Sequence, residues 1–97
     1  MMESIKRQEP SVDTLNPNDK LEMRALNRIN ELPATLKHEA MGKCAGGISY
    51  SNALTMTLAG ALKEKGMNSG HAADVAAMTA YEEGDSNWKI AIGFLNK

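Results

Sequence analysis

Residues 49–84 decide the fold, and they read SYSNALTMTLAGALKEKGMNSGHAADVAAMTAYEEG. The first half of this stretch begins with two serines, Ser49 and Ser51, either of which suits the N-cap of a helix. Apolar residues then recur at helical spacing, which predicts one buried face: Leu54, Leu58, Ala61 and Leu62. Gly66 follows these residues. Glycine suits this position because the residue after a helix often adopts the left-handed backbone conformation. The first half is therefore predicted to be a helix.

The second half of the stretch predicts another helix, from near Ser69 to Glu83, with Gly84 ending it. Alanines lie all round this helix: Ala72, Ala73, Ala76, Ala77 and Ala80. Small side chains allow neighbouring backbones to approach closely. We therefore expect this alanine-rich segment to be a central helix of the fold.

Two more helices are predicted upstream, and proline separates them. Asn16-Pro17 suits a helix start because asparagine caps well and proline at the first helical position loses no bonded amide. One apolar stripe follows: Leu21, Ala25, Ile29 and Leu32. Pro33 ends this helix and opens the next, over residues 34–44, before the Gly46-Gly47 stop. The inward residues of the second helix are Leu36, Ala40, Met41 and Cys44.

The two ends of the chain are less patterned. Residues 1–16 are polar and aperiodic, which predicts a flexible N-terminal arm. Residues 87–97 fit a helix capped by Ser86 or an alternating strand. We favour the helix because a lone strand needs a pairing partner and only the short stretch of residues 48–50 offers one. The predicted fold is all-α: a compact bundle of four or five short helices in a single domain, residues 17–97.

Composition limits the function classes. The chain has 97 residues and a formal net charge of −1, so no long-range field attracts nucleic acid or an anionic membrane. Its one cysteine, Cys44, excludes an internal disulfide and favours the reducing interior of a cell. There is no apolar run long enough to span a membrane, and the start MMESIKRQEP lacks the apolar region of a secretory signal. We expect a cytoplasmic protein.

No standard catalytic or metal motif is complete. His38-Glu39 begins a zinc-protease pattern, but Gly42 stands where the second histidine is required. Cys44 falls in register with the apolar face of its helix, which favours a small buried residue over a nucleophile paired with His38 or His71. The sequence predicts a protein that is not an enzyme and has no cofactor and no metal.

An alternative is a helix-turn-helix DNA-binding regulator built from residues 54–78. Two helices joined at Gly66 have roughly that layout. However, Lys65 stands where an apolar residue is usual before the turn glycine. The second helix also carries acidic residues and no lysine or arginine, whereas phosphate contacts depend on cationic donors. Nucleic acid is therefore the disfavoured partner.

The strongest candidate for a partner-binding site is a basic row on the first helix. Lys20, Arg24 and Arg28 stand four residues apart, within about 80° of arc. We expect them along the exposed edge of the apolar stripe, so that replacing the arginines leaves the fold intact. Met23 and Met56 fall off the apolar stripes and suit a surface that adapts to a partner.

These features favour a non-enzymatic protein-binding regulator, such as an inhibitor, an adaptor or an antitoxin-like accessory module. The apolar side chains of residues 88–95 present more surface than one face of a small monomer can bury. We therefore also expect a homodimer, or a partner that covers this segment.

Overall fold

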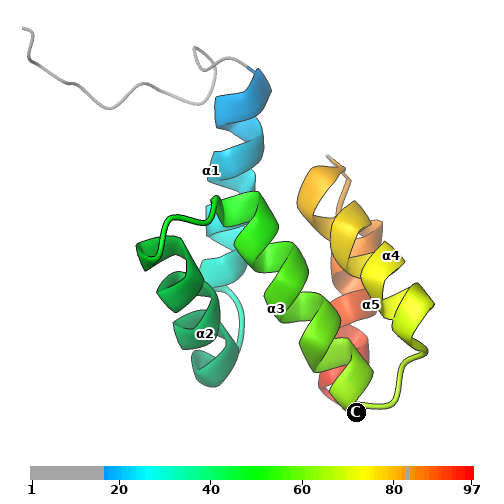
Figure 1. Ribbon diagram of the computed structural model, residues 1–97. Helices are drawn as coiled ribbons and strands as arrows, with labels where there is room; N and C mark the ends of the chain where they lie inside the picture. The colour runs from blue at the N-terminus through cyan, green and yellow to red at the C-terminus, as the bar shows by residue number, and fades with distance from the viewer. Residues whose placement is uncertain (1–16, 83) are drawn as a thin grey trace, which may run out of the picture.

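Five α-helices and no strand make up the part of the chain that the structure, a computed structural model, describes: residues 17–82 and 84–97 (Figure 1). The helices are α1 Pro17–Asn30, α2 Ala34–Ala45, α3 Tyr50–Glu64, α4 Ser69–Tyr81 and α5 Ser86–Leu95. The prediction of an all-α, compact bundle is confirmed, and so is the helical reading of the last segment. The predicted arm, residues 1–16, lies outside the described residues.

Local capping explains the boundaries of α3 and α4. The Ser49 side chain accepts a hydrogen bond of 3.2 Å from the backbone N–H of Asn52 at the start of α3. The Asn68 side chain does the same at α4, accepting from the N–H groups of Gly70 and His71. Gly66 ends the α3 segment at φ +108°, as the sequence predicts.

Two predicted boundaries differ slightly from the structure. Helix α4 ends at Tyr81, before the predicted Glu83, because Glu82 already has an extended backbone. Ser86 is the first residue of α5 and not its cap; Asp85 holds the N-cap position without a side-chain capping bond.

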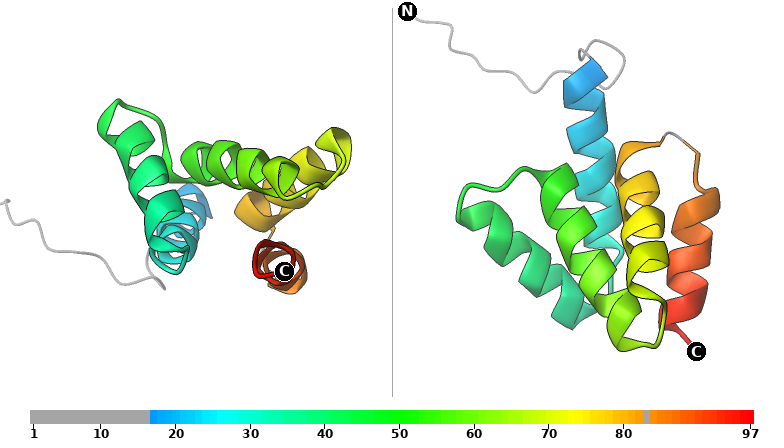
Figure 2. Two further views of the ribbon diagram at one scale, coloured as in Figure 1. Left: turned by 90° about the horizontal axis from the view of Figure 1, so that it is seen from below. Right: turned by 45° about the vertical axis from the view of Figure 1, so that its right-hand side comes forward.

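The helix at the centre of the bundle is α3; α4, predicted as a central helix, packs against α1, α3 and α5. Helix α3 packs against all four other helices. Figure 2, seen from below, shows α1 and α2 on one flank of α3 and α4 and α5 on the other. The reason is side-chain size, because α3 buries large residues on several sides. The alanines of α4 allow a close approach to α3 on one face, and Ala73 on another face is exposed.

The core forms where these helices meet. Its largest fully buried apolar side chains come from α1 and α3: Ile29, Leu54, Leu58 and Leu62. The predicted stripe of α1 is confirmed for Ala25 and Ile29, and Leu32 is buried just beyond the helix end. Burial of these groups is the main source of stability.

A carboxylate of α1 fastens that helix to the start of α3. Glu22 Oε1 accepts a hydrogen bond of 2.7 Å from the backbone N–H of Tyr50, and Glu22 Oε2 accepts one of 2.6 Å from Ser51 Oγ. Free N–H groups at a helix start favour a negative charge. This contact fixes the position of α1, and with it the position of the basic row.

Candidate functional site

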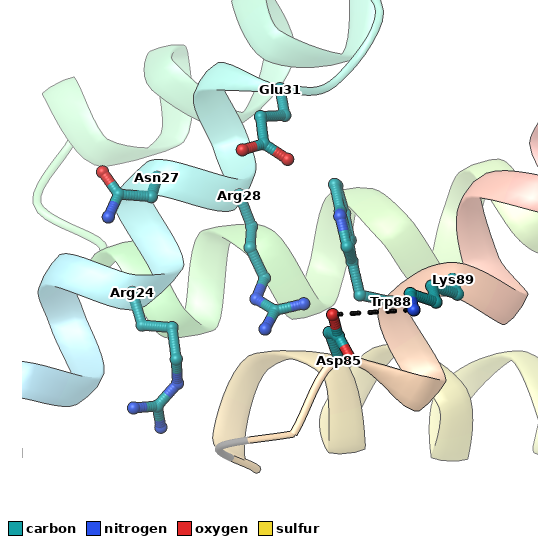
Figure 3. Close-up of a pocket in the computed structure, with 7 residues that line it drawn as sticks. All are labelled: Arg24, Asn27, Arg28, Glu31, Asp85, Trp88 and Lys89. Carbon is teal, nitrogen blue, oxygen red and sulfur yellow. Dashed lines mark ion pairs between the residues drawn. The ribbon is translucent and has the colours of Figure 1, made fainter.

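The basic row borders a hollow of about 430 Å³ between α1 and the start of α5 (Figure 3). Three residues of α1, one residue just beyond its end and three from the start of α5 line it: Arg24, Asn27, Arg28, Glu31, Asp85, Trp88 and Lys89. The Arg28 side chain extends from α1 toward Asp85 and the start of α5, and the Arg24 side chain lies farther from α5. The site therefore joins segments far apart in the sequence.

Arg28 lies between the two helices, and the expectation that it occupies an exposed edge is wrong. Only 9% of the residue is exposed. Its guanidinium carbon lies 5.5 Å from the centre of the Trp88 ring, and its Nη2 donates a hydrogen bond of 3.4 Å to the carbonyl oxygen of Gly84. Packing of α5 against the bundle covers Arg28, and the apolar periodicity of α1 alone does not indicate that packing.

Two nitrogen atoms of the arginines that line the hollow have no acceptor among the described residues. Arg28 Nη1 and Arg24 Nε are both buried atoms without a hydrogen-bond partner in that part of the chain. Burial lowers the pKa of the Arg28 guanidinium, and the positive charge of Arg24 lowers it further. Leaving such donors buried and unpaired is costly, so the arrangement favours an anionic acceptor.

Two carboxylates at the edge of the hollow limit its positive charge. The negative charges of Asp85 and Glu31 raise the pKa of Arg28. Burial and the positive charge of Arg24 lower this pKa more strongly. Asp85 also lies 4.0 Å from the Lys89 ammonium, and both side chains of this pair are largely exposed. With three cations and two carboxylates, the lining carries a net charge of +1.

A second hollow of about 240 Å³ adjoins the first along α1. It is lined by Lys20 and Met23 together with Arg24 and Asn27, which also line the first hollow. The structure thus brings four of the five predicted site residues together. Met56 lies apart: it is 51% exposed and lines a separate hollow between α2 and α3.

The predicted basic row does not include Asn27, Glu31, Asp85, Trp88 or Lys89, and Trp88 and Lys89 belong only to the separately predicted apolar segment of residues 88–95. Asn27 and Glu31 follow from the register of α1, because each stands three or four residues from a member of the basic row. The α5 residues join the site only through the packing of two distant segments. The single tryptophan of the chain could have indicated the site, because tryptophan is enriched among the residues that contribute most to binding energy at interfaces.

The residues considered for thiol or metal chemistry do not converge. In the described ranges, no three histidine, cysteine or acidic side chains lie close enough to hold a metal ion, and His38 and His71 are both exposed. Cys44 is half-buried against the core rather than fully buried. Burial, and then the negative charge of Glu22, raises the pKa of its thiol, which is the opposite of what a nucleophile needs.

The helices of the alternative helix-turn-helix, α3 and α4, run side by side in opposite directions (Figures 1 and 2). Helix α4 contains no lysine or arginine, and its exposed side includes Asp74. A recognition helix with this composition has no cation for the phosphate backbone.

The apolar segment behind the homodimer prediction is partly covered by the chain itself. Ala91 is buried, and Trp88, Ile92, Phe94 and Leu95 pack against the core. Ile90 is the large apolar side chain of α5 that stays half-exposed. Self-association remains a prediction, with less exposed apolar surface behind it.

None of the five described helices combines the length and apolar character needed to cross a bilayer. Comparisons with protein-family models, with curated proteins and with solved structures gave no match to this chain. The site geometry therefore carries the functional argument.

Proposed function

We propose that this chain is a non-enzymatic protein-binding regulator that contacts its partner through the exposed side of α1 and the start of α5. The observation that carries the proposal is the pair of arginines, Arg24 and Arg28, with buried N–H donors that lack acceptors in the described residues. Both arginines line an open hollow together with Trp88. Arginine and tryptophan are the residue types that contribute most to binding energy at protein interfaces.

The neighbouring hollow supports a protein partner in particular. Met23 is 38% exposed beside Lys20 and Arg24, so flexible apolar surface and positive charge are presented together. A methionine side chain adapts its shape to an apolar partner. Apolar contacts surrounded by charged residues are the usual composition of a protein–protein interface.

The test is affinity capture with the intact chain, comparing wild type, Arg24→Gln and Lys37→Gln. Lys37 is an exposed cation on α2, away from the hollow, and controls for the loss of one charge. A specific partner should be recovered equally by wild type and Lys37→Gln and at least fivefold less by Arg24→Gln. Equal recovery by all three variants would place the contact surface elsewhere.

Duplex DNA is the other arm of this test. A helix-turn-helix regulator would bind random duplex with an affinity that falls steeply between about 50 and 200 mM salt. We expect no such binding. Sedimentation equilibrium on the same preparations would measure self-association.

A further inference from the structure

We propose that the hollow between α1 and α5 is a carboxylate-binding pocket, and that the partner inserts an acidic side chain of a peptide segment between Arg24 and Arg28. The inference deepens the proposed function and rests on it. It names the chemistry of the group that the partner supplies.

The donors define the class of ligand. Arg28 is held by Trp88 on one side and by the Gly84 carbonyl at Nη2, which leaves Nη1 as a buried donor without an acceptor in the described chain. Arg24 Nε is a second such donor, one helical turn away. Planar guanidinium groups fit the two oxygens of a carboxylate, and the resulting charge-assisted hydrogen bonds are about twice as strong as neutral ones.

The arginines are also set up for binding before the ligand arrives. The Trp88 ring and the Gly84 carbonyl restrict the Arg28 side chain, so little further side-chain freedom is lost when an anion binds. Burial already keeps water from part of both guanidinium groups. An incoming carboxylate would replace unsatisfied donors by ion-paired ones, and that gain is large for buried groups.

The charge of the lining favours a single carboxylate over a nucleic-acid strand. Three cations and two carboxylates give a net charge of +1, which one carboxylate neutralises. Nucleic-acid affinity instead depends on neutralising several phosphates in succession. Asp85, Glu31 and the exposed Glu82 would repel such a series of charges.

The adjoining hollow indicates what stands next to the acidic residue. The two hollows share Arg24 and Asn27, and Met23 lies at the far end of the second. An apolar partner side chain about one helical turn from the acid would rest on Met23 and on the aliphatic stem of Lys20. The expected ligand is therefore an acidic peptide with an apolar residue nearby.

The experiment is an NMR titration of the intact protein with the blocked peptide acetyl-Leu-Ala-Ala-Ala-Glu-amide. The matched control peptide has Gln in place of Glu. We expect saturable shifts of the Trp88 indole N–H and of the Arg24 and Arg28 Nε–H resonances. The Gln peptide should bind about tenfold more weakly, because it lacks the charge-assisted bonds.

Variants separate a binding role from a structural one. Arg24→Gln should abolish the shifts, whereas Lys37→Gln should leave them unchanged. Asp85→Asn should tighten binding of the Glu peptide about two- to fivefold, because it removes a competing negative charge at the edge. Asp85 makes no side-chain capping bond, so this variant keeps its helix start. A merely structural pocket would not gain affinity.

The outcomes are distinct. Equal binding of the Glu and Gln peptides, or no shift at high peptide concentration, would overturn the carboxylate inference. Stronger shifts with inorganic phosphate or single-stranded DNA at the same ionic strength would overturn it in favour of a phosphate ligand. If partner capture depends on Arg24 while the Glu peptide fails, the proposed function stands and this inference falls. If the peptide binds but no protein is captured, the pocket chemistry stands and the proposed function falls.

Discussion

Arg28 on α1 stacks against Trp88 on α5, with 5.5 Å between the guanidinium carbon and the ring centre. Through this contact α5, the last helix of the described chain, covers Arg28 of the candidate site. It also gives Arg28 two separable roles: its aliphatic stem fills space between helices, and its charged end faces the hollow.

The stem and the charge can be separated by substitution. Arg28→Ala should lower the free energy of unfolding by about 1–2 kcal/mol, because it removes the packing of a buried stem. Arg28→Met keeps the stem volume and removes a partly desolvated charge, so its loss should stay under about 0.5 kcal/mol. Urea unfolding followed by circular dichroism and Trp88 fluorescence measures both. Equal losses would show that the charge itself stabilises the fold.

Glu22 should stabilise the protein through its contact with α3. Glu22→Ala should cost about 1–2 kcal/mol, because it removes the acceptor for the Tyr50 N–H and for Ser51 Oγ. Ser51→Ala in the same background should then cost less than it does in wild type. A double-mutant cycle with a coupling energy of about 0.5–1 kcal/mol is expected. Additive losses would mean that the two side chains act independently.

Gly60 and Gly66 form a matched pair, since a Cβ added at either position meets no atom within 4 Å. Gly60 is inside α3, so Gly60→Ala should raise the free energy of unfolding by about 0.5–1 kcal/mol. Gly66 has a φ of +108°, so Gly66→Ala should lower it by about 1 kcal/mol. Thermal unfolding of the two variants should move in opposite directions, and shifts of the same sign would contradict this account.

Cys44 should react slowly in the folded protein. Burial and Glu22 raise the pKa of its thiol, so the thiolate fraction at neutral pH is smaller in the folded state than in the unfolded state. Because the folded-state pKa is the higher one, stability from this group is present at lower pH and is lost as the pH rises through the thiol range. Alkylation by iodoacetamide between pH 7 and 9, with and without urea, measures the difference. A faster reaction in the folded state would indicate an activated thiol.

The sequence predicted the helices well because their signals are local. Pro17, Pro33 and Gly66 act through their own backbone and Ser49 through a side-chain bond three residues on, and the structure shows helix boundaries at or beside them. The periodic apolar residues of α1 and α3 likewise indicate their buried faces without reference to any other helix.

The errors arose where distant segments meet. The burial of Arg28 depends on Trp88, and Glu22 bonds to a helix start far along the chain. The alanines of α4 predict close packing of that helix, but they do not indicate that α3 lies at the centre of the bundle. Centrality depends instead on which helix presents large apolar groups to several neighbours, as α3 does. The basic row was predictable as a row, but its pairing with α5 was not.

The most direct test of the central claim is photo-crosslinking with a benzophenone side chain placed at Met23 or at Met78 of the intact chain. The two methionines are similarly exposed, at 38% and 43%, but Met23 is on α1 beside the arginines and Met78 is on α4. The account predicts a crosslinked protein partner from the Met23 position, lost when Arg24→Gln is added, and none from the Met78 position. Crosslinking from Met78 alone, or crosslinking from Met23 that is unaffected by Arg24→Gln, would contradict it.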